Sequence, residues 1–109
     1  MVNRIDKKLA SLKSDGKPAL VPYLTVGYPT VSSSYEIAQA LLNSGADMLE
    51  LGIPFSDPLA DGPTIQDSST IAIKNGMNTN ILFDQLKGIR DEVSIPLIIM
   101  GYFLSLIHI

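Results

Sequence analysis

Two acidic residues stand where an enzyme built on a parallel sheet would use them. Glu50 lies inside the apolar run 48–51, and Asp61 lies near the far end of the loop that follows, 52–63. Two carboxylates that converge on one pocket can divide acid–base work and charge stabilisation between them. A plainer interpretation stays equally open at this point: Glu50 is satisfied by a lysine or a backbone donor, and Asp61 caps a helix.

The position of Glu50 within its apolar run predicts which side of the strand it occupies. Side chains alternate along a strand, so Glu50 shares a face with Met48 and Gly52, opposite Leu49 and Leu51. Because an ionised carboxylate is costly to bury, this group should be paired, hydrated or protonated. Active sites form at the carboxyl ends of parallel strands, where such a group is suited to proton transfer.

Three short apolar runs predict the strands that position these acids. They span 19–26, 48–51 and 95–102. Pro22 counts against a central strand in the first run, because proline removes a donor from the hydrogen-bonding ladder. The loop 52–63 is long for a connection in an α/β protein and holds three prolines, which indicates a shaped functional loop.

Helices are predicted before and between the strands. Apolar spacing indicates a first helix over 2–12 that stops at Gly16. Ser33 with Glu36 reads as a capping box that opens a second helix, which Gly45 closes. Two further helices are indicated by apolar faces at Ile65, Ser69, Ala72 and Ile73, and at Leu82, Leu86, Ile89 and Val93.

The resulting order, a helix followed by β-α-β-α-α-β, predicts an α/β fold. Strands separated by helical crossovers pair in parallel, and continuous apolar runs indicate burial on both faces. An open doubly wound sheet and a (β/α)8 barrel both fit. The open sheet would require a glycine-rich phosphate turn after the first strand, and Gly27-Tyr28-Pro29 lacks the required glycines.

Composition excludes several classes of function. The net charge is −3, and lysine and arginine are scattered along the sequence, which predicts no basic patch and no nucleic-acid partner. With no cysteine, a disulfide framework and a thiolate metal site are both excluded. The charged start 1–8 predicts no secretory signal, and the apolar stretch 95–109 is shorter than the ~20 residues of a membrane span. A single cytoplasmic domain without a membrane segment is expected.

The most specific feature of the chain is the segment 50–66. It reads Glu-Leu-Gly-Ile-Pro-Phe-Ser-Asp-Pro-Leu-Ala-Asp-Gly-Pro-Thr-Ile-Gln, and it resembles the signature of the tryptophan synthase α chain family almost letter for letter. Residues 22–29 are similar to that family's first strand and loop, and residues 96–102 to its third strand. The resemblance covers residues 1–103, and chance does not produce a match of this specificity.

This resemblance implies a fold and a reaction. The fold would be the N-terminal part of a TIM (β/α)8 barrel, with a leading helix and about three βα units. The reaction would be the retro-aldol cleavage of indole-3-glycerol phosphate to indole and glyceraldehyde 3-phosphate, a lyase step of tryptophan biosynthesis that uses no metal and no cofactor. Glu50 would be the general acid–base, and Asp61 would hydrogen-bond the indole nitrogen.

The resemblance also implies a substrate pocket and a partner. Tyr23 and Tyr102 match positions that line the indole pocket, although core packing explains Tyr102 equally well, and Met100 is expected in the core. Asp57 and Pro58 lie on the loop that meets the β subunit in the family's α2β2 heterotetramer. Pyridoxal phosphate would belong to that partner and not to this chain.

After Phe103 the chain departs from the family pattern. The family continues with Asn-Pro, whereas residues 104–109 read Leu-Ser-Leu-Ile-His-Ile. We expect these six residues to be an unmatched tail that arises from truncation or a sequencing artefact, and we reject His108 as a catalyst. Three strands cannot close a barrel of roughly 250 residues, so the chain alone should be inactive.

Two other functions remain as alternatives. The first is another phosphate-handling TIM-barrel enzyme, such as a sugar-phosphate isomerase, which the loop from Pro54 to Asp61 does not resemble. The second is a non-catalytic segment that only docks on a β-type partner through the loop around Asp57. Activity and partner binding, measured side by side, would separate these alternatives.

Overall fold

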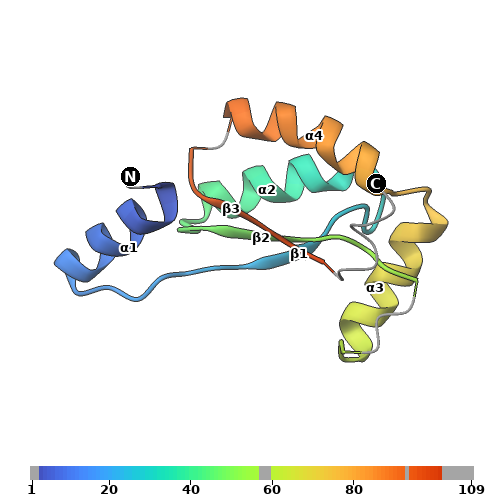
Figure 1. Ribbon diagram of the computed structural model, residues 1–109, viewed down its shortest axis with the longest axis horizontal. Coiled ribbons are helices and arrows are strands. Elements are labelled where there is room, and N and C mark those ends of the chain that lie inside the picture. Colours follow the sequence, from blue (N-terminus) through green and yellow to red (C-terminus); the bar gives the residue numbers. More distant parts are fainter. Residues whose placement is uncertain (1–2, 57–59, 93, 102–109) are drawn as a thin grey trace.

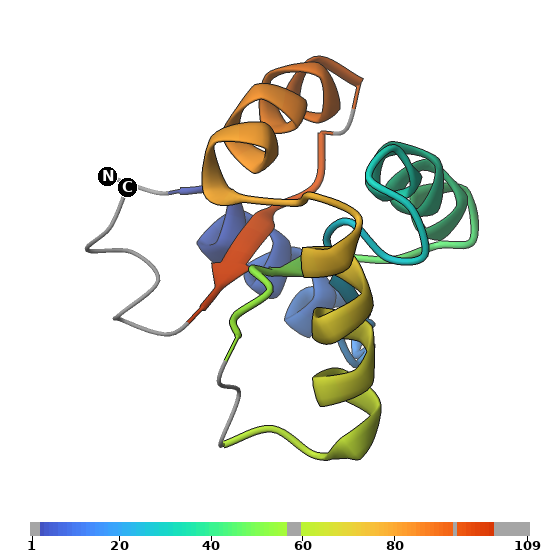
Figure 2. The ribbon, with the colours of Figure 1, turned by 90° about the vertical axis from the view of Figure 1, so that its right-hand side faces the viewer.

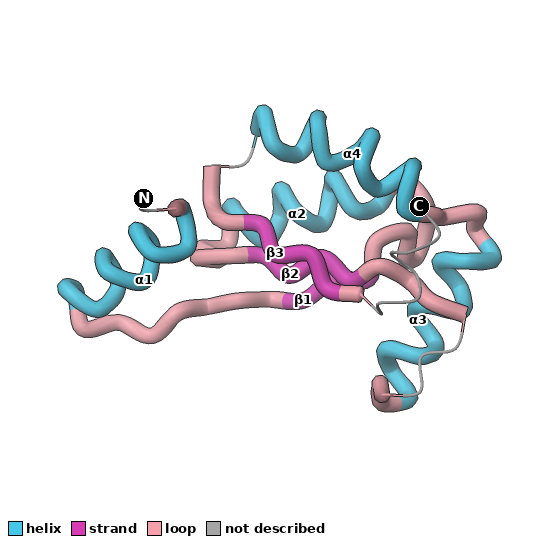
Figure 3. The backbone as a smooth tube through the Cα atoms, in the orientation of Figure 1, coloured by secondary structure: helices cyan, strands magenta, loops and turns pink. Residues whose placement is uncertain are grey.

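Four helices and three short strands make up the protein in a computed structural model that describes residues 3–56, 60–92 and 94–101. Their order confirms the predicted helix followed by β-α-β-α-α-β, and Figures 1 and 3 show the arrangement. The elements are α1 (Arg4–Asp15), β1 (Tyr23–Thr25), α2 (Ser33–Asn43), β2 (Leu49–Gly52), α3 (Pro63–Lys74), α4 (Thr79–Glu92) and β3 (Leu97–Met100).

The three strands form one parallel sheet in the order β1-β2-β3. In its register Tyr23 lies beside Glu50, and Glu50 lies beside Ile98. The first strand is shorter than predicted and begins only after Pro22, which has no N–H to donate. The carbonyl oxygen of Pro22 still accepts a hydrogen bond of 2.9 Å from the backbone N–H of Glu50. The proline therefore shortens the strand at its amino end and does not prevent it from forming.

Two helices cover one face of the sheet, and the other two lie near its ends. In Figures 1 and 2, α2 and α4 run side by side over one face, α1 lies beyond the amino ends of the strands, and α3 lies near their carboxyl ends. The core forms under α2 and α4. Its fully buried apolar side chains are Val26, Ala38, Leu49, Leu51, Ala72, Leu82 and Ile89.

The helix ends agree with the sequence at the glycines but not at Ser33. Gly16, Gly45 and Gly76 all have positive φ one or two residues after the end of a helix, the conformation in which glycine is favoured. The capping box predicted at Ser33 and Glu36 is wrong. The N-cap is Ser32, and the Ser33 hydroxyl instead accepts a hydrogen bond of 3.1 Å from the N–H of Thr30 in the preceding turn.

Polar contacts join α3 to the carboxyl end of β1. The hydroxyls of Thr25 and Ser68 share a buried hydrogen bond of 2.7 Å. The Asn75 amide donates to the carbonyl oxygens of Gly27 and Pro29 at 3.0 and 2.7 Å. Since α3 follows the loop that carries Asp61, these contacts also position the end of that loop.

The edge strand β3 is less covered than β2, whose Leu49 and Leu51 are fully buried. Leu97 and Ile98 are half-buried and Ile99 is 42% exposed, as expected for a strand with incomplete packing. Met100 is 48% exposed, so its predicted place in the core is wrong. Among the described residues, no helix is both long and apolar enough to cross a membrane.

Candidate active site

Glu50 stands in the middle of β2 and points away from the helical layer. Its neighbours Leu49 and Leu51 are fully buried among the core residues, while Glu50 itself is only partly buried. This confirms the alternation predicted from the sequence. Within the described part of the chain, the Glu50 carboxylate has no hydrogen bond or ion pair. Of the three states expected for this group, pairing with another described residue is therefore not observed.

Tyr23 and Gly52 form a matched pair on the same face. A Cβ built on Gly52 would overlap the hydroxyl oxygen and Cζ of Tyr23 and would lie 2.7 Å from its Cε2. The tyrosine ring therefore crosses directly over Gly52, two residue pairs further along the sheet than its own partner, Glu50. A larger residue at position 52 would displace the end of the tyrosine side chain, so glycine is favoured here by steric fit and not by its backbone angles.

A pocket of about 250 Å³ opens at the carboxyl end of the sheet. It brings together two predicted site residues, Tyr23 and Asp61, whereas Glu50 lies next to Tyr23 in the sheet and is not part of the lining. The complete described lining is Tyr23, Ile53, Ala60, Asp61, Met100 and Gly101. One carboxylate and one phenol among apolar walls suit a flat apolar ring that carries a single N–H group.

Asp61 reaches this pocket from a loop that is held by a hydrogen bond at each end. The backbone N–H of Ile53 donates to the carbonyl oxygen of Met100 at 2.8 Å, and the Gln66 amide donates to the carbonyl oxygen of Asp61 at 2.8 Å. The N-cap of α3 is Gly62, followed by Pro63. Asp61 is therefore not the helix cap that the plainer interpretation required. Its half-buried place in the pocket favours a role in binding.

Several predicted residues cannot be placed in this pocket. Asp57, Pro58, Tyr102, His108 and the whole tail 104–109 lie outside the described residues. Among the described residues, no group of three or more histidine, cysteine, aspartate or glutamate side chains could hold a metal ion.

The sequence missed four of the residues that line the pocket: Ile53, Ala60, Met100 and Gly101. Met100 lies beside Gly52 in the sheet, and a Cβ on Gly101 would meet Cδ1 of Ile53 at 3.3 Å. The sequence did contain evidence for Met100, because it lies two residues before the proposed pocket residue Tyr102 and alternate residues of a strand point to the same face. The register that brings Met100 beside Gly52 could not be predicted from the sequence.

The chain is similar along most of its length to one protein family. The family model for "Tryptophan synthase alpha chain" matches residues 9–109. The tryptophan synthase alpha chain of Flavobacterium psychrophilum is 57% identical over 102 residues, and that of Christiangramia forsetii is 59% identical over 102 residues. Each alignment covers 94% of this chain. The chain spans 39% of the first relative's length and 38% of the second's.

Solved structures of similar proteins share the fold. The tryptophan synthase subunit alpha of Legionella pneumophila superposes with a TM-score of 0.95 at 38% identity, over 99% of this chain and 42% of that one. A tryptophan synthase structure from M. tuberculosis superposes with a TM-score of 0.90 at 29% identity, over 98% of this chain and 43% of the other. The identity in both comparisons is high enough to reflect common ancestry as well as common shape.

Proposed function

Since this chain belongs to the tryptophan synthase alpha chain family, we propose that it supplies the first part of an active site that cleaves indole-3-glycerol phosphate to indole and glyceraldehyde 3-phosphate. The predicted fold is confirmed: the leading helix and the parallel βα units are the N-terminal part of a (β/α)8 barrel. The alternative of an open doubly wound sheet is thereby excluded.

The observation that carries this proposal is the placement of Asp61 and Tyr23 in one pocket beside Glu50. Glu50 and Tyr23 are neighbours across β1 and β2, and Tyr23 and Asp61 line the same hollow at the carboxyl end of the sheet. In barrel enzymes this is the end at which chemistry takes place. The same residues belong to the segments that resemble the family, so the geometry and the ancestry support one site.

The proposed roles follow from what the reaction needs. Cleavage of the bond between the indole ring and the glycerol chain requires a proton on the ring carbon and the loss of a proton from the adjacent hydroxyl. Glu50, free of an ion pair within the described residues, gives the first proton and accepts the second. Positive charge that develops near the indole nitrogen is stabilised by the Asp61 carboxylate. No proton is gained or lost overall by the protein.

The remaining roles of the complete protein extend beyond this chain. In barrel enzymes the phosphate is commonly bound by loops after late strands, which a chain that spans 39% of its relatives does not include. We propose that Asp57 and Pro58 contact a β subunit in an α2β2 complex, that pyridoxal phosphate is used only by that partner, and that Tyr102 closes the indole pocket. Cytoplasmic location is part of the same proposal. The expected unmatched tail 104–109 is not part of it, because the family match extends to residue 109.

The roles of the two loop acids can be separated in a completed chain, here residues 1–103 joined to the corresponding remainder of the Flavobacterium psychrophilum protein. Asp61→Asn should lower indole release by roughly 10²-fold, because a charge-stabilising group is lost from the transition state. Asp57→Ala should leave cleavage by the α chain largely unchanged and weaken binding of the β subunit. Steady-state indole release and β-subunit titration measure the two effects.

Asp67→Asn on the exposed side of α3 is the matched control and should change neither quantity. If Asp57→Ala abolishes cleavage and leaves partner binding intact, the assignment of the two acids is reversed. If the completed chain binds the β subunit but releases no indole, the docking-only alternative replaces the enzymatic one.

The fit of Tyr23 over Gly52 predicts a stability defect. Gly52→Ala should destabilise the completed chain by about 1–3 kcal/mol, the usual cost of overpacking, because the added Cβ forces the tyrosine ring out of its place. Urea unfolding measures the change. Tyr23→Ala should relieve the clash, so that the double variant is less destabilised than the sum of the single variants.

Gly88→Ala is the matched control for this substitution, since Gly88 lies in α4 and a Cβ there would meet nothing within 4 Å. It should be neutral or slightly stabilising. Strictly additive effects of Gly52→Ala and Tyr23→Ala would show that the two residues do not share this space.

A further inference from the structure

Asp61 lies in the loop between β2 and α3 and belongs to no helix or strand. A group that acts on a substrate must be held within roughly 0.5 Å of its productive position. Gly62, the N-cap of α3, has no side chain that could fix the turn, and Pro63 after it has no N–H to donate. The position of Asp61 therefore depends on side chains of neighbouring residues.

The side chain of Gln66 gives this support from the first turn of α3. Its amide nitrogen Nε2 donates a hydrogen bond of 2.8 Å to the carbonyl oxygen of Asp61, and its backbone N–H donates one of 3.0 Å to the carbonyl oxygen of Gly62. Gln66 thereby holds two consecutive peptide groups on the carboxyl side of Asp61. Because a fixed carbonyl limits rotation of the Asp61 backbone, it also limits where the carboxylate can lie.

The helix that carries Gln66 is itself fixed to the sheet. Two residues further along α3, the hydroxyl of Ser68 shares a hydrogen bond of 2.7 Å with the hydroxyl of Thr25 in β1, and both side chains are buried. After the other end of α3, the Asn75 amide donates to two backbone carbonyl oxygens of the segment that follows β1. Gln66 therefore connects Asp61 to an element whose own position is set by the sheet.

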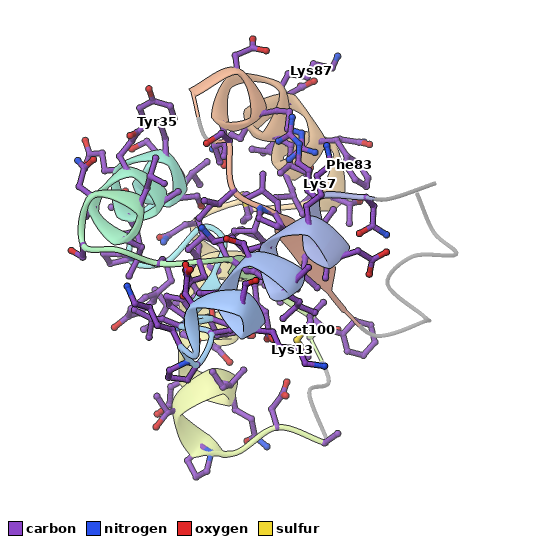
Figure 4. The ribbon with its side chains drawn as sticks, turned by 90° about the vertical axis from the view of Figure 1, so that its left-hand side faces the viewer. Lys7, Lys13, Tyr35, Phe83, Lys87 and Met100 are labelled. Carbon is purple, nitrogen blue, oxygen red and sulfur yellow. The ribbon has the colours of Figure 1, made fainter. Side chains whose placement is uncertain are left out.

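We propose, on the basis of the function proposed above, that Gln66 is a positioning residue that acts on the reaction only through Asp61. By fixing the Asp61 backbone, it holds the carboxylate where the indole nitrogen is bound. The pocket and α4 lie on opposite sides of the molecule: in Figure 4, Met100 of the pocket lining lies far from Phe83 and Lys87 of α4. An amide on α4 should therefore have no such effect.

Gln66→Met tests the proposal in the completed chain, because methionine has a similar length and cannot donate a hydrogen bond. The kcat for indole release should fall about tenfold, less than in Asp61→Asn, since a displaced carboxylate keeps part of its effect. In the Asp61→Asn background the same substitution should change kcat by less than about twofold, because no carboxylate is left to position. Steady-state indole release measures the four proteins of this cycle.

Gln85→Met is the matched control, since the Gln85 amide of α4 donates a similar bond, of 2.7 Å, to the carbonyl oxygen of Val31. Its kcat should stay within about twofold of the unmodified completed chain. Urea unfolding checks that each variant is folded, and Gln66→Glu, which keeps the size of the side chain without the donor, replaces Gln66→Met if methionine impairs folding. An unchanged kcat, or an equal loss with and without the Asp61 carboxylate, overturns the proposal.

Ligand binding separates a failure of this positioning role from a failure of the proposed function. In calorimetry, the unmodified completed chain should bind indole about tenfold more tightly than 1-methylindole, because methylation removes the N–H that donates to Asp61. Gln66→Met should reduce this ratio severalfold, and Gln85→Met should preserve it. A completed chain with no preference for indole contradicts the positioning of Asp61 at the ring nitrogen.

The two proposals give different combinations of results. If the binding ratio falls in Gln66→Met but the completed chain releases no indole, the positioning role stands and the proposed reaction is wrong. If indole is released and Asp61→Asn abolishes the release, while Gln66→Met changes neither kcat nor the binding ratio, only the positioning role is wrong.

Discussion

Replacing Glu50 by glutamine is expected to lower indole release by the completed chain roughly 10²–10⁴-fold, the usual contribution of a general acid–base, or more if the residue serves two steps. The carboxylate is partly buried on the uncovered face of the sheet and, among the described residues, is engaged in no ion pair. Glutamine keeps the size and polarity of the side chain but can neither release nor accept a proton in the working pH range.

The effect should fall on kcat, whereas KM should change little. Glutamine matches glutamate in size and polarity, so this substitution should leave the bound ring in place. Glu36→Gln is the matched control, because Glu36 is exposed on α2 and should be silent in both parameters. Retention of most of the kcat by Glu50→Gln would remove this residue from the chemistry and leave Asp61 as the only candidate acid in the site.

The 109-residue chain assayed without the rest of the barrel should show no cleavage above the uncatalysed rate. Its sheet has an unpaired outer edge on both β1 and β3 among the described residues. Apolar side chains that further packing would cover are open, with Ile99 42% and Met100 48% exposed. On α1 no residue is fully buried, and Leu9 is 47% exposed. Open edges and exposed apolar surface favour aggregation or loose packing.

A second reason is that binding energy from the phosphate would be lost. Enzymes use interactions with remote parts of the substrate to position the reacting atoms, and a chain without the late loops of the barrel lacks those interactions. Indole fluorescence measures turnover, and urea unfolding followed by circular dichroism measures cooperativity, with the completed chain as the positive control. A 109-residue chain that unfolds cooperatively and also releases indole above background would refute the expectation.

The sequence was sufficient to predict those structural features that depend only on residues close together in the chain. Helical spacing and glycines after helix ends located α1 and the end of α2, and apolar runs located all three strands, because periodicity and left-handed turns are local properties. Alternation along β2 placed Glu50 opposite Leu49 and Leu51, as the structure confirms. The segment from Glu50 to Gln66 was specific enough to indicate the family.

Tertiary structure alone decided which distant residues meet. The Ser33 hydroxyl could serve either its own helix or the preceding turn, and the position of Thr30 decided between them. Met100 was expected in the core because it is apolar, but the sheet turns it toward the pocket beside Gly52. The Arg4 side chain of α1 donates a hydrogen bond to the carbonyl oxygen of Ser94, 90 residues later in the chain. Such contacts depend on strand register and helix packing, which arise from the combined shapes of many side chains. Hydrophobic periodicity therefore cannot predict them.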